Sequence, residues 1–259
     1  MKKFFQALTF LTVLPGPRYT SDTDQPFDAA EWGRSAVWYP AVGLIIGIFL
    51  TLLAAGVTRV FPNTVAPVLV VIGWAWITGG LHLDGLADCC DGLFASVSKE
   101  RRLEIMRDPR MGAFGGIGLV LMLLLKTAAI ASTQVKIAYV NSIDLSFALL
   151  YAPVVARFAL LLVAKRRSAR PGGMGDAFAR GISPLAFIAG AMLLIAVMFL
   201  DPNPLRAAGA LAAALAATAM VILFARSRLG GMTGDVLGLS VEISEVAVLL
   251  VYASRFGAR

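Results

Sequence analysis

Long apolar segments alternate with short polar segments along almost the whole chain. An α-helix rises about 1.5 Å per residue, so roughly 20 apolar residues cross the hydrocarbon core of a bilayer, which is about 30 Å thick. Segments of this length recur from residue 36 onward. The pattern predicts about seven transmembrane helices, within a range of six to eight, at 36–57, 65–83, 113–132, 147–164, 184–200, 205–225 and 236–252.

The N-terminal segment, residues 1–14, has a different pattern. Phe4, Leu8 and Leu11 recur at helical spacing with polar residues between them, which predicts an amphipathic helix lying at the membrane interface. The segment begins like a signal peptide, but no cleavage site of small residues follows it. The later loops are too short for a second folded domain. The expected fold is therefore all-α: a polytopic integral membrane helical bundle that forms one transmembrane domain over residues 1–259.

Composition and charge support a membrane protein. The chain is 58% hydrophobic and 15% charged, whereas charged residues make up about 25% of soluble domains. A net charge of +7 could suggest nucleic-acid binding, but the basic residues are distributed unevenly between alternate loops. The N-terminal segment and the loops around 83–112, 165–182 and 226–235 hold 16 Lys and Arg residues, and the other side holds 5. By the positive-inside rule these loops face the cytoplasm, which predicts a multi-pass protein of the cell inner membrane.

One stretch interrupts the apolar pattern with three acids in eight residues, Asp84, Asp88 and Asp91. Read as a helix, Asp88 lies roughly 40° and Asp91 roughly 20° from the direction of Asp84, so the three carboxylates share one face. Such a face repels itself unless a cation neutralises it, and carboxylates suit Mg²⁺, which keeps places for water and substrate phosphate. A solvated helix face is the alternative, but no Lys or Arg occurs between Arg59 and Lys99. We predict that the three aspartates bind Mg²⁺ together with a phosphorylated substrate.

Two basic residues, Lys126 and Arg157, lie inside predicted spans. A charge there costs about 2.5–3.5 kcal/mol on insertion scales, so each side chain is expected to face the protein interior and to meet an anion. The anion is either the phosphate of a substrate or an acid of the protein, such as Asp235 or Glu242, which are seven residues apart and share a helical face. We predict substrate binding for all four residues, with the substrate's diphosphate as the partner of Lys126.

The polar segment before the third predicted span contains Arg107, Asp108 and Arg110, followed by several glycines. One arginine side chain can bind two phosphate oxygens at once, and glycines let backbone N–H groups approach an anion at a helix start. Arg107 and Arg110 are therefore candidate substrate-binding residues, although a solvated cytoplasmic loop would explain them almost as well.

The single histidine, His82, excludes a zinc site built on several histidines. In a straight helix it projects about 160° from Asp84, so we expect it to pack behind the acids rather than to bind the metal. Cys89 and Cys90 are the only cysteines and are adjacent, so no structural disulfide is expected.

These motifs, in this order, resemble those of the cobalamin synthase family, also called adenosylcobinamide-GDP ribazoletransferases. The similar segments are HLDGLADCCDG, RDPRMGAFGG and GGMTGDVLGLSVEISE, with ALTFLTVLPGP near the N-terminus and WYPAVGLIIG in the first predicted span. The resemblance covers nearly the whole chain. The chain is more distantly similar to the CDP-alcohol phosphotransferases, but it lacks the Ala-Arg pair of their aspartate-rich helix, since Asp88 follows Ala87.

The resemblance implies an Mg²⁺-dependent transferase for the final assembly step of cobalamin biosynthesis, with a single catalytic domain in the membrane. The reaction would transfer the adenosylcobinamide phosphate group from adenosylcobinamide-GDP to the 3′-hydroxyl of α-ribazole or α-ribazole 5′-phosphate. The products would be GMP and adenosylcobalamin or its 5′-phosphate. One acid must accept the hydroxyl proton, and we expect this to be Asp108, with Asp91 as the second candidate. The expected partners are these substrates and the lipid bilayer, without nucleic acid, and self-association into a homo-oligomer is compatible with the sequence.

Other classes of protein share some of these features. CDP-alcohol phosphotransferases and intramembrane prenyltransferases also use aspartate-rich helices with Mg²⁺ on a diphosphate. An ion or metabolite transporter would place acids along its pathway, but the acids here cluster at the cytoplasmic ends of the predicted spans rather than at mid-membrane. The transferase is therefore the favoured interpretation.

The charge asymmetry predicts the orientation of the bundle, which reporter fusions can test. Fusions in loops with few basic residues should report a periplasmic position, and fusions in the basic loops a cytoplasmic one. Two or more reversed positions would refute the orientation. Suitable positions are Asn63, Asn141 and Asn203 for the first set and Lys99, Ser168 and Ser227 for the second.

Overall fold

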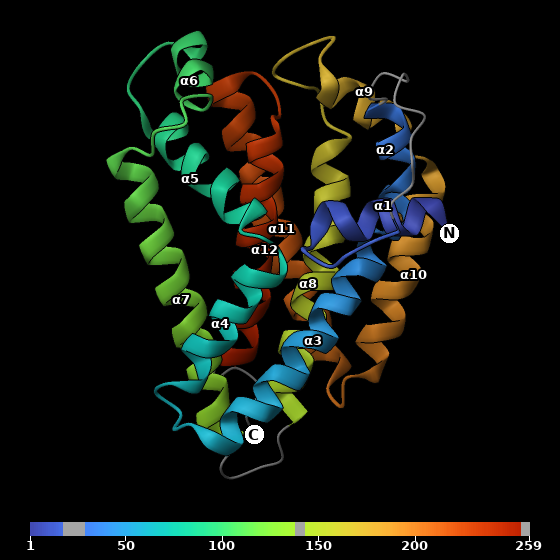
Figure 1. Cartoon of the computed structure of the whole chain (residues 1–259), viewed down its shortest axis with the longest axis vertical. Helices are drawn as coiled ribbons and strands as arrows, with labels where there is room; N and C mark the ends of the chain where they lie inside the picture. Colours follow the sequence, from blue (N-terminus) through green and yellow to red (C-terminus); the bar gives the residue numbers. More distant parts are fainter. Residues whose placement is uncertain (18–28, 138–142, 255–259) are drawn as a thin grey trace.

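The computed structural model describes residues 1–17, 29–137 and 143–254, and within them the chain is helical apart from its connections. The only strand-like pairing in these ranges is an isolated bridge between Ser168 and Met232. The predicted all-α fold is confirmed. Figure 1 shows the helices α1 Lys2–Leu11, α2 Ala29–Ser35, α3 Tyr39–Val60, α4 Ala66–Ile77, α5 Leu81–Phe94, α6 Lys99–Ile105, α7 Ala113–Ile137, α8 Ile143–Ala164, α9 Met174–Gly181, α10 Pro184–Leu200, α11 Pro204–Leu229 and α12 Gly234–Ala253, with a short 3₁₀ turn at Ala36–Trp38 between α2 and α3.

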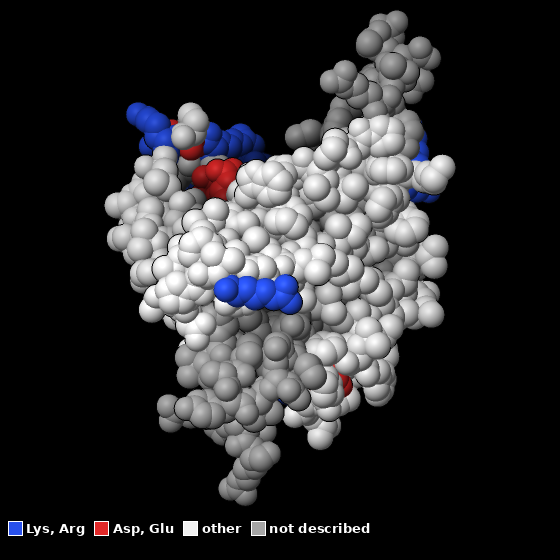
Figure 2. All heavy atoms as spheres, turned by 60° about the horizontal axis from the view of Figure 1, so that its bottom comes forward, with Lys and Arg blue, Asp and Glu red and all other residues white. Residues whose placement is uncertain are grey.

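The helices have the length and the surface of a multi-pass membrane protein. Five are long and apolar enough to cross a membrane, and up to seven spans result if each of two bent helix pairs counts as one. Large apolar side chains point outward from them, such as Leu52 of α3, Leu124 of α7 and Met220 of α11. Figure 2 shows a broad surface on which almost all visible described side chains are uncharged, while charged side chains gather mainly at its upper edge. The predicted polytopic bundle is therefore confirmed.

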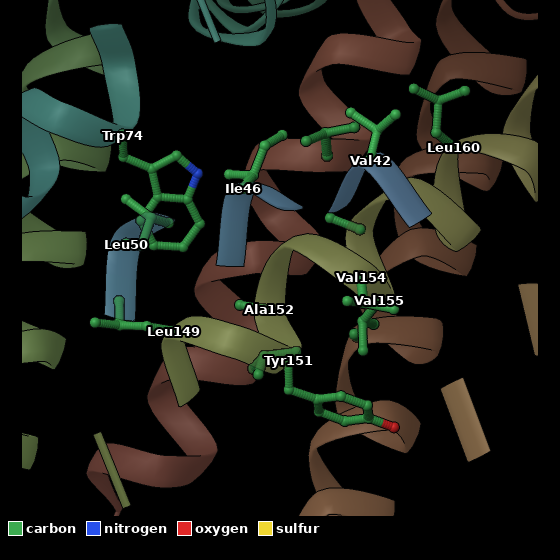
Figure 3. Close-up of a cluster of buried hydrophobic side chains, with 14 of the residues drawn as sticks. Val42, Ile46, Leu50, Trp74, Leu149, Tyr151, Ala152, Val154, Val155 and Leu160 are labelled. Carbon is green, nitrogen blue, oxygen red and sulfur yellow. The ribbon is translucent and has the colours of Figure 1, made fainter. Parts of the chain in front are cut away.

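Helix α8 forms the centre of the bundle. In its 18-residue apolar window, 78% of residues are buried, against 22% in the window of α11. α8 packs against α3 on one side and α12 on the other, and α4 adds Trp74 to the same core. In a bilayer such packing rests on van der Waals contact between close helices. The side chains in Figure 3 include Val42, Ile46 and Leu50 from α3 and Leu149, Tyr151, Ala152, Val154, Val155 and Leu160 from α8.

The second predicted span is broken before it reaches the aspartates. Helix α4 ends at Ile77, and α5 leaves it at an angle of 92°. Gly79 and Gly80 occupy the break with φ of 60° and 68°, a left-handed conformation that glycine adopts without steric cost. The predicted second span over 65–83 is therefore a bent pair of helices rather than one straight helix. The aspartates lie on a separate helix whose direction the two glycines set.

Three short helices lie beside the same end of the bundle as α5. Figure 1 shows α2 and α9 at the upper end and α1 crosswise to the long helices, where it contacts α2 and α3. The predicted N-terminal helix is confirmed as α1, which buries Ala7, Leu8 and Leu11 against the bundle. Phe10 of α1 remains 41% exposed.

Candidate active site at one end of the bundle

Two loops that are far apart in the sequence pair next to the start of α12. The backbone N–H of Ala169 donates to the Met232 carbonyl (2.8 Å), and that of Met232 donates to the Arg167 carbonyl (2.9 Å). α11 ends at Leu229, and the φ of 77° at the following residue, Gly230, turns the chain into this contact. The GGMTGD motif thus fixes where α12 begins, and it holds the α8–α9 connection beside that point.

Helix α5 touches the first turn of α12 backbone to backbone. A Cβ added at Gly85 would lie 2.8 Å from the carbonyl oxygen of Asp235, so no larger residue fits there without displacing one helix. This contact brings Asp235 next to the aspartates of α5, and the charges of Asp235, Asp84 and Asp91 all act on Asp88. Sequence reasoning treated Asp235 as a substrate ligand and did not group it with the α5 acids.

Asp91, predicted as a metal ligand and as the second candidate for the base, makes two backbone hydrogen bonds. Its Oδ2 accepts from the N–H of Gly112 (2.7 Å) and its Oδ1 from the N–H of Gly115 (2.9 Å). Both donors lie at the start of α7, where backbone N–H groups lack intrahelical partners. Asp91 therefore caps α7 and joins it to α5.

Asp84 and Asp88 have the chemistry of a partial magnesium site. Within the described residues, no group of three or more His, Cys, Asp or Glu side chains could surround a metal ion by itself. Mg²⁺, however, usually takes one or two carboxylates and fills its other positions with water and substrate phosphate. In the same part of the chain, neither residue forms an ion pair with a basic side chain. Two unpaired hard oxygen donors close to a third acid fit this ion.

A cavity of about 710 Å³ opens beside these acids. Its walls come from α1, α2, α5, α8, α9 and α12 and from the paired loops. The lining residues include an acidic, a basic and an aromatic group. They are the acids Asp84 and Asp235, the arginines Arg107, Arg166 and Arg170, and the aromatic residues Phe10, Trp32 and Phe178.

The loop after α6 contributes one of its three predicted site residues to the cavity. Arg107 lines it, but Asp108 and Arg110 do not. Arg110 instead donates to both carboxylate oxygens of Asp108, over 2.9 and 2.8 Å. These hydrogen bonds lower the pKa of the exposed Asp108 to about 2, and a carboxylate of such low pKa is a weak proton acceptor. This geometry does not favour Asp108 as the base or Arg110 as a phosphate ligand.

Lys126 and Arg157 meet acids of the protein inside the bundle. The Lys126 Nζ lies 2.6 Å from Oε2 of Glu242 and 2.6 Å from Oε2 of Glu245, and Arg157 forms an ion pair with the same Glu245. All four side chains are at most 4% exposed. The cluster contains two cations and two anions, and the Lys126 Nζ also lies 4.5 Å from the centre of the Trp74 ring.

This cluster corrects the sequence-based expectation for three residues. Lys126, Arg157 and Glu242 were predicted to bind substrate, but none of them lines the large cavity. The alternative that the anion is an acid of the protein is favoured instead. The sequence pointed toward it, since Glu242 and Glu245 lie inside a predicted span, but it did not show which acid each cation meets.

His82 lies at the boundary between the cluster and the cavity. Its side chain is buried and lines the cavity, and its Nε2 has no hydrogen-bond partner among the residues that the structure describes. Cys89 is buried and Cys90 half-buried, and both are free thiols.

Fold and site together define a class: a multi-pass helical membrane protein with an acidic, arginine-edged cavity at one end of its bundle, suited to a phosphorylated substrate. Comparison with known proteins identifies the family within this class. The family model described as cobalamin-5-phosphate synthase matches residues 3–253, nearly the whole chain. The chain belongs to this family, and the resemblance seen in its motifs is confirmed.

Three relatives that match this chain have the same name. A protein of Clostridium botulinum (strain Loch Maree / Type A3), named adenosylcobinamide-GDP ribazoletransferase, is 37% identical over 228 residues, which cover 86% of this chain and 88% of the relative. Proteins with the same name from Geotalea daltonii and Klebsiella pneumoniae (strain 342) are each 34% identical over 258 residues. These matches cover 99% of both chains for the first, and 96% of this chain and 98% of the relative for the second. No solved structure matches the chain significantly.

The buried cluster predicts that Lys126→Met destabilises the protein before any substrate is added. Removing one partner leaves Glu242 buried without its cation, a change that costs about 3–5 kcal/mol in other buried pairs. We expect a lower melting temperature in detergent, measured by thermal unfolding.

The double variant Lys126→Met/Glu242→Gln is the matched control for this effect. It removes the unpaired charge together with the cation, so it should recover part of the lost stability. A Lys126→Met protein as stable as wild type would contradict the structural role of the pair.

Proposed function

We propose that this protein is an adenosylcobinamide-GDP ribazoletransferase that catalyses the final assembly step of cobalamin biosynthesis. The 3′-hydroxyl oxygen of α-ribazole or its 5′-phosphate forms a bond to the phosphorus next to cobinamide. The bond between that phosphorus and the oxygen of GMP breaks, and GMP leaves with the electron pair. The proposal is supported by family membership along nearly the whole chain and, above all, by Asp84 and Asp235 meeting at a cavity that arginines also line.

Asp84 and Asp88 would hold Mg²⁺ beside the donor's diphosphate. When bound, the ion would neutralise phosphate oxygens and stabilise the charge that develops on the GMP leaving group. Arg107 lines the same cavity, and its guanidinium can bind phosphate oxygens of the donor in a bidentate manner. Asp91 contributes indirectly, because its caps on α7 hold the acidic face of α5 in position.

Asp235 is the acid best suited to accept the proton from the 3′-hydroxyl. It lines the cavity and lies among the α5 acids, whereas Asp108 is bonded to Arg110 and both oxygens of Asp91 accept backbone N–H groups. Thr233 donates from its Oγ1 to Oδ2 of Asp235 (3.2 Å), which orients the carboxylate and leaves Oδ1 available to a hydroxyl. A proton acceptor must reach the attacking hydroxyl, so position argues for Asp235.

The proposed location is the cell inner membrane, with this end of the bundle facing the cytoplasm. The basic loops of the predicted cytoplasmic side include the segments after α5 and after α8, and both contribute arginines to the cavity. Nucleotide substrates would then enter from the compartment in which they are made.

The central experiment uses the purified protein in detergent with adenosylcobinamide-GDP, α-ribazole or its 5′-phosphate, and Mg²⁺. Release of GMP together with a cobalamin product supports the proposal, and chelation of the metal with EDTA should stop both. Cleavage of the donor without a cobalamin product would point to a different diphosphate-using transferase and would overturn it.

The metal assignment predicts that Asp84→Asn and Asp88→Asn each abolish most turnover without loss of thermal stability. An amide in place of a carboxylate binds Mg²⁺ poorly. Glu104→Gln is the matched control, since Glu104 is an exposed acid at the same end of the bundle that pairs only with Arg101 among the described residues. An aspartate variant that keeps most of its activity across a Mg²⁺ titration would remove that residue from the site.

The base assignment predicts different outcomes for Asp235→Asn and Asp108→Asn. A positioned base contributes about 10²- to 10⁴-fold to the rate, so kcat should fall by that order in the first variant and far less in the second. Single-turnover rates measured over a pH series report the two effects. If Asp108→Asn lowers kcat more than Asp235→Asn does, Asp108 is the base instead.

A further inference from the structure

One part of the cavity forms an aromatic wall built from three separate helices. The ring centroids of Phe10 in α1 and Trp32 in α2 are 5.6 Å apart in an edge-on arrangement. Tyr39 lies behind them, stacked with Phe10 at 6.0 Å and with Phe178 of α9 at 6.2 Å. Phe10, Trp32 and Phe178 all line the cavity. Such a wall suits a flat aromatic ligand, because stacked or edge-on rings attract one another.

Arg170 lies in the same cavity with hydrogen-bonding capacity to spare. Its Nη2 donates to the Leu103 carbonyl (3.2 Å), while its buried Nε has no partner within the described chain. Burial, followed by the nearby charge of Arg107, lowers the pKa of Arg170. The two guanidinium groups that line the cavity repel each other, and an anion bound between them would relieve this repulsion.

The backbone around Arg170 is held in place. The Oγ of Ser168 accepts from the N–H of Arg170 (3.0 Å), and the adjoining residues pair with the GGMTGD loop at Met232. The Asp235 carboxylate lies near enough to Arg170 for the two charges to interact. The cation is therefore fixed close to the acid proposed to accept the hydroxyl proton.

The cavity is large enough for the acceptor but not for the whole donor. Cavities of about 300–1,000 Å³ hold drug-sized ligands, and this one measures about 710 Å³. A nucleoside or nucleoside monophosphate falls in that class. The donor carries a corrin ring, an adenosyl group and GDP, so only part of it would enter.

We propose that the part of this cavity between the aromatic wall and Arg170 is the acceptor site, with the aromatic base of the acceptor against Trp32 and Phe178 and an anionic 5′-substituent on Arg170. The 3′-hydroxyl then points toward Asp235 and the α5 acids. This assignment rests on the proposed function and adds to it the residues that recognise the acceptor. Arg170 is the residue that distinguishes a 5′-phosphorylated acceptor from a free nucleoside.

The first test compares acceptors in the Arg170→Gln variant. A hydrogen bond to a charged group contributes about 1.5–3 kcal/mol, so KM for α-ribazole 5′-phosphate should rise about 10- to 150-fold. KM for free α-ribazole and for adenosylcobinamide-GDP should stay within about twofold of wild type. Arg167→Gln is the matched control, because Arg167 is exposed in the same loop and does not line the cavity.

Two outcomes of this comparison overturn the assignment. An equal rise in KM for both acceptors would show that Arg170 does not bind the 5′-phosphate. A rise in KM for adenosylcobinamide-GDP alone would show that Arg170 binds the donor's diphosphate instead. Wild-type protein that releases no GMP with either acceptor would instead refute the proposed function itself.

The second test concerns the aromatic wall. Stacking of a base on an aromatic side chain contributes about 1–3 kcal/mol, so Phe178→Leu should raise KM about 5- to 150-fold for both acceptors alike. Phe178→Tyr keeps the ring and should keep the wild-type KM, which would assign the effect to the aromatic ring. If Phe178→Leu raises KM for the donor and leaves both acceptors unchanged, the cavity is not the acceptor site.

Discussion

The site depends on the contact between α5 and the first turn of α12. Gly85 leaves no room for a side chain against the Asp235 backbone, and the left-handed glycines before α5 send the helix toward that contact. Without the break, the acids of α5 would continue the line of α4 and leave the start of α12. The loop pairing at Met232 fixes the other partner. Two backbone constraints thus bring Asp84 and Asp235 together, and everything proposed about the chemistry follows from their meeting.

The charges inside the bundle fall into two groups with opposite character. Lys126, Arg157, Glu242 and Glu245 neutralise one another in the interior, where an unpaired charge is costly. This neutral cluster ties α7 and α8 to α12 below the site. The acids at the end of the bundle lack such partners, apart from the nearby Arg170, and therefore remain available to a cation. Helix α12 therefore carries two kinds of acid. Glu242 and Glu245 stabilise the bundle, and Asp235 belongs to the proposed active site.

The division of the cavity into acidic, basic and aromatic parts matches the chemistry of a nucleotide acceptor. In the proposed complex, the acids would meet a hydroxyl and a magnesium-bound diphosphate, the arginines a phosphate, and the aromatic rings a base. The aromatic part comes from α1, α2 and α9, the short helices beside the bundle. These helices complete the wall on which the acceptor would rest.

The sequence by itself determined the helical membrane fold, the α1 helix, most of the span boundaries and the family, because apolar length, helical periodicity and motif order are local properties of the chain. It also singled out Asp84, Asp88 and Arg107. Only the tertiary structure decided which charges meet. Asp235 joins the α5 acids, and Lys126 meets two glutamates, through contacts between residues more than a hundred positions apart. Periodicity tells which face a side chain occupies, but which helix packs against that face depends on the three-dimensional arrangement of the whole bundle.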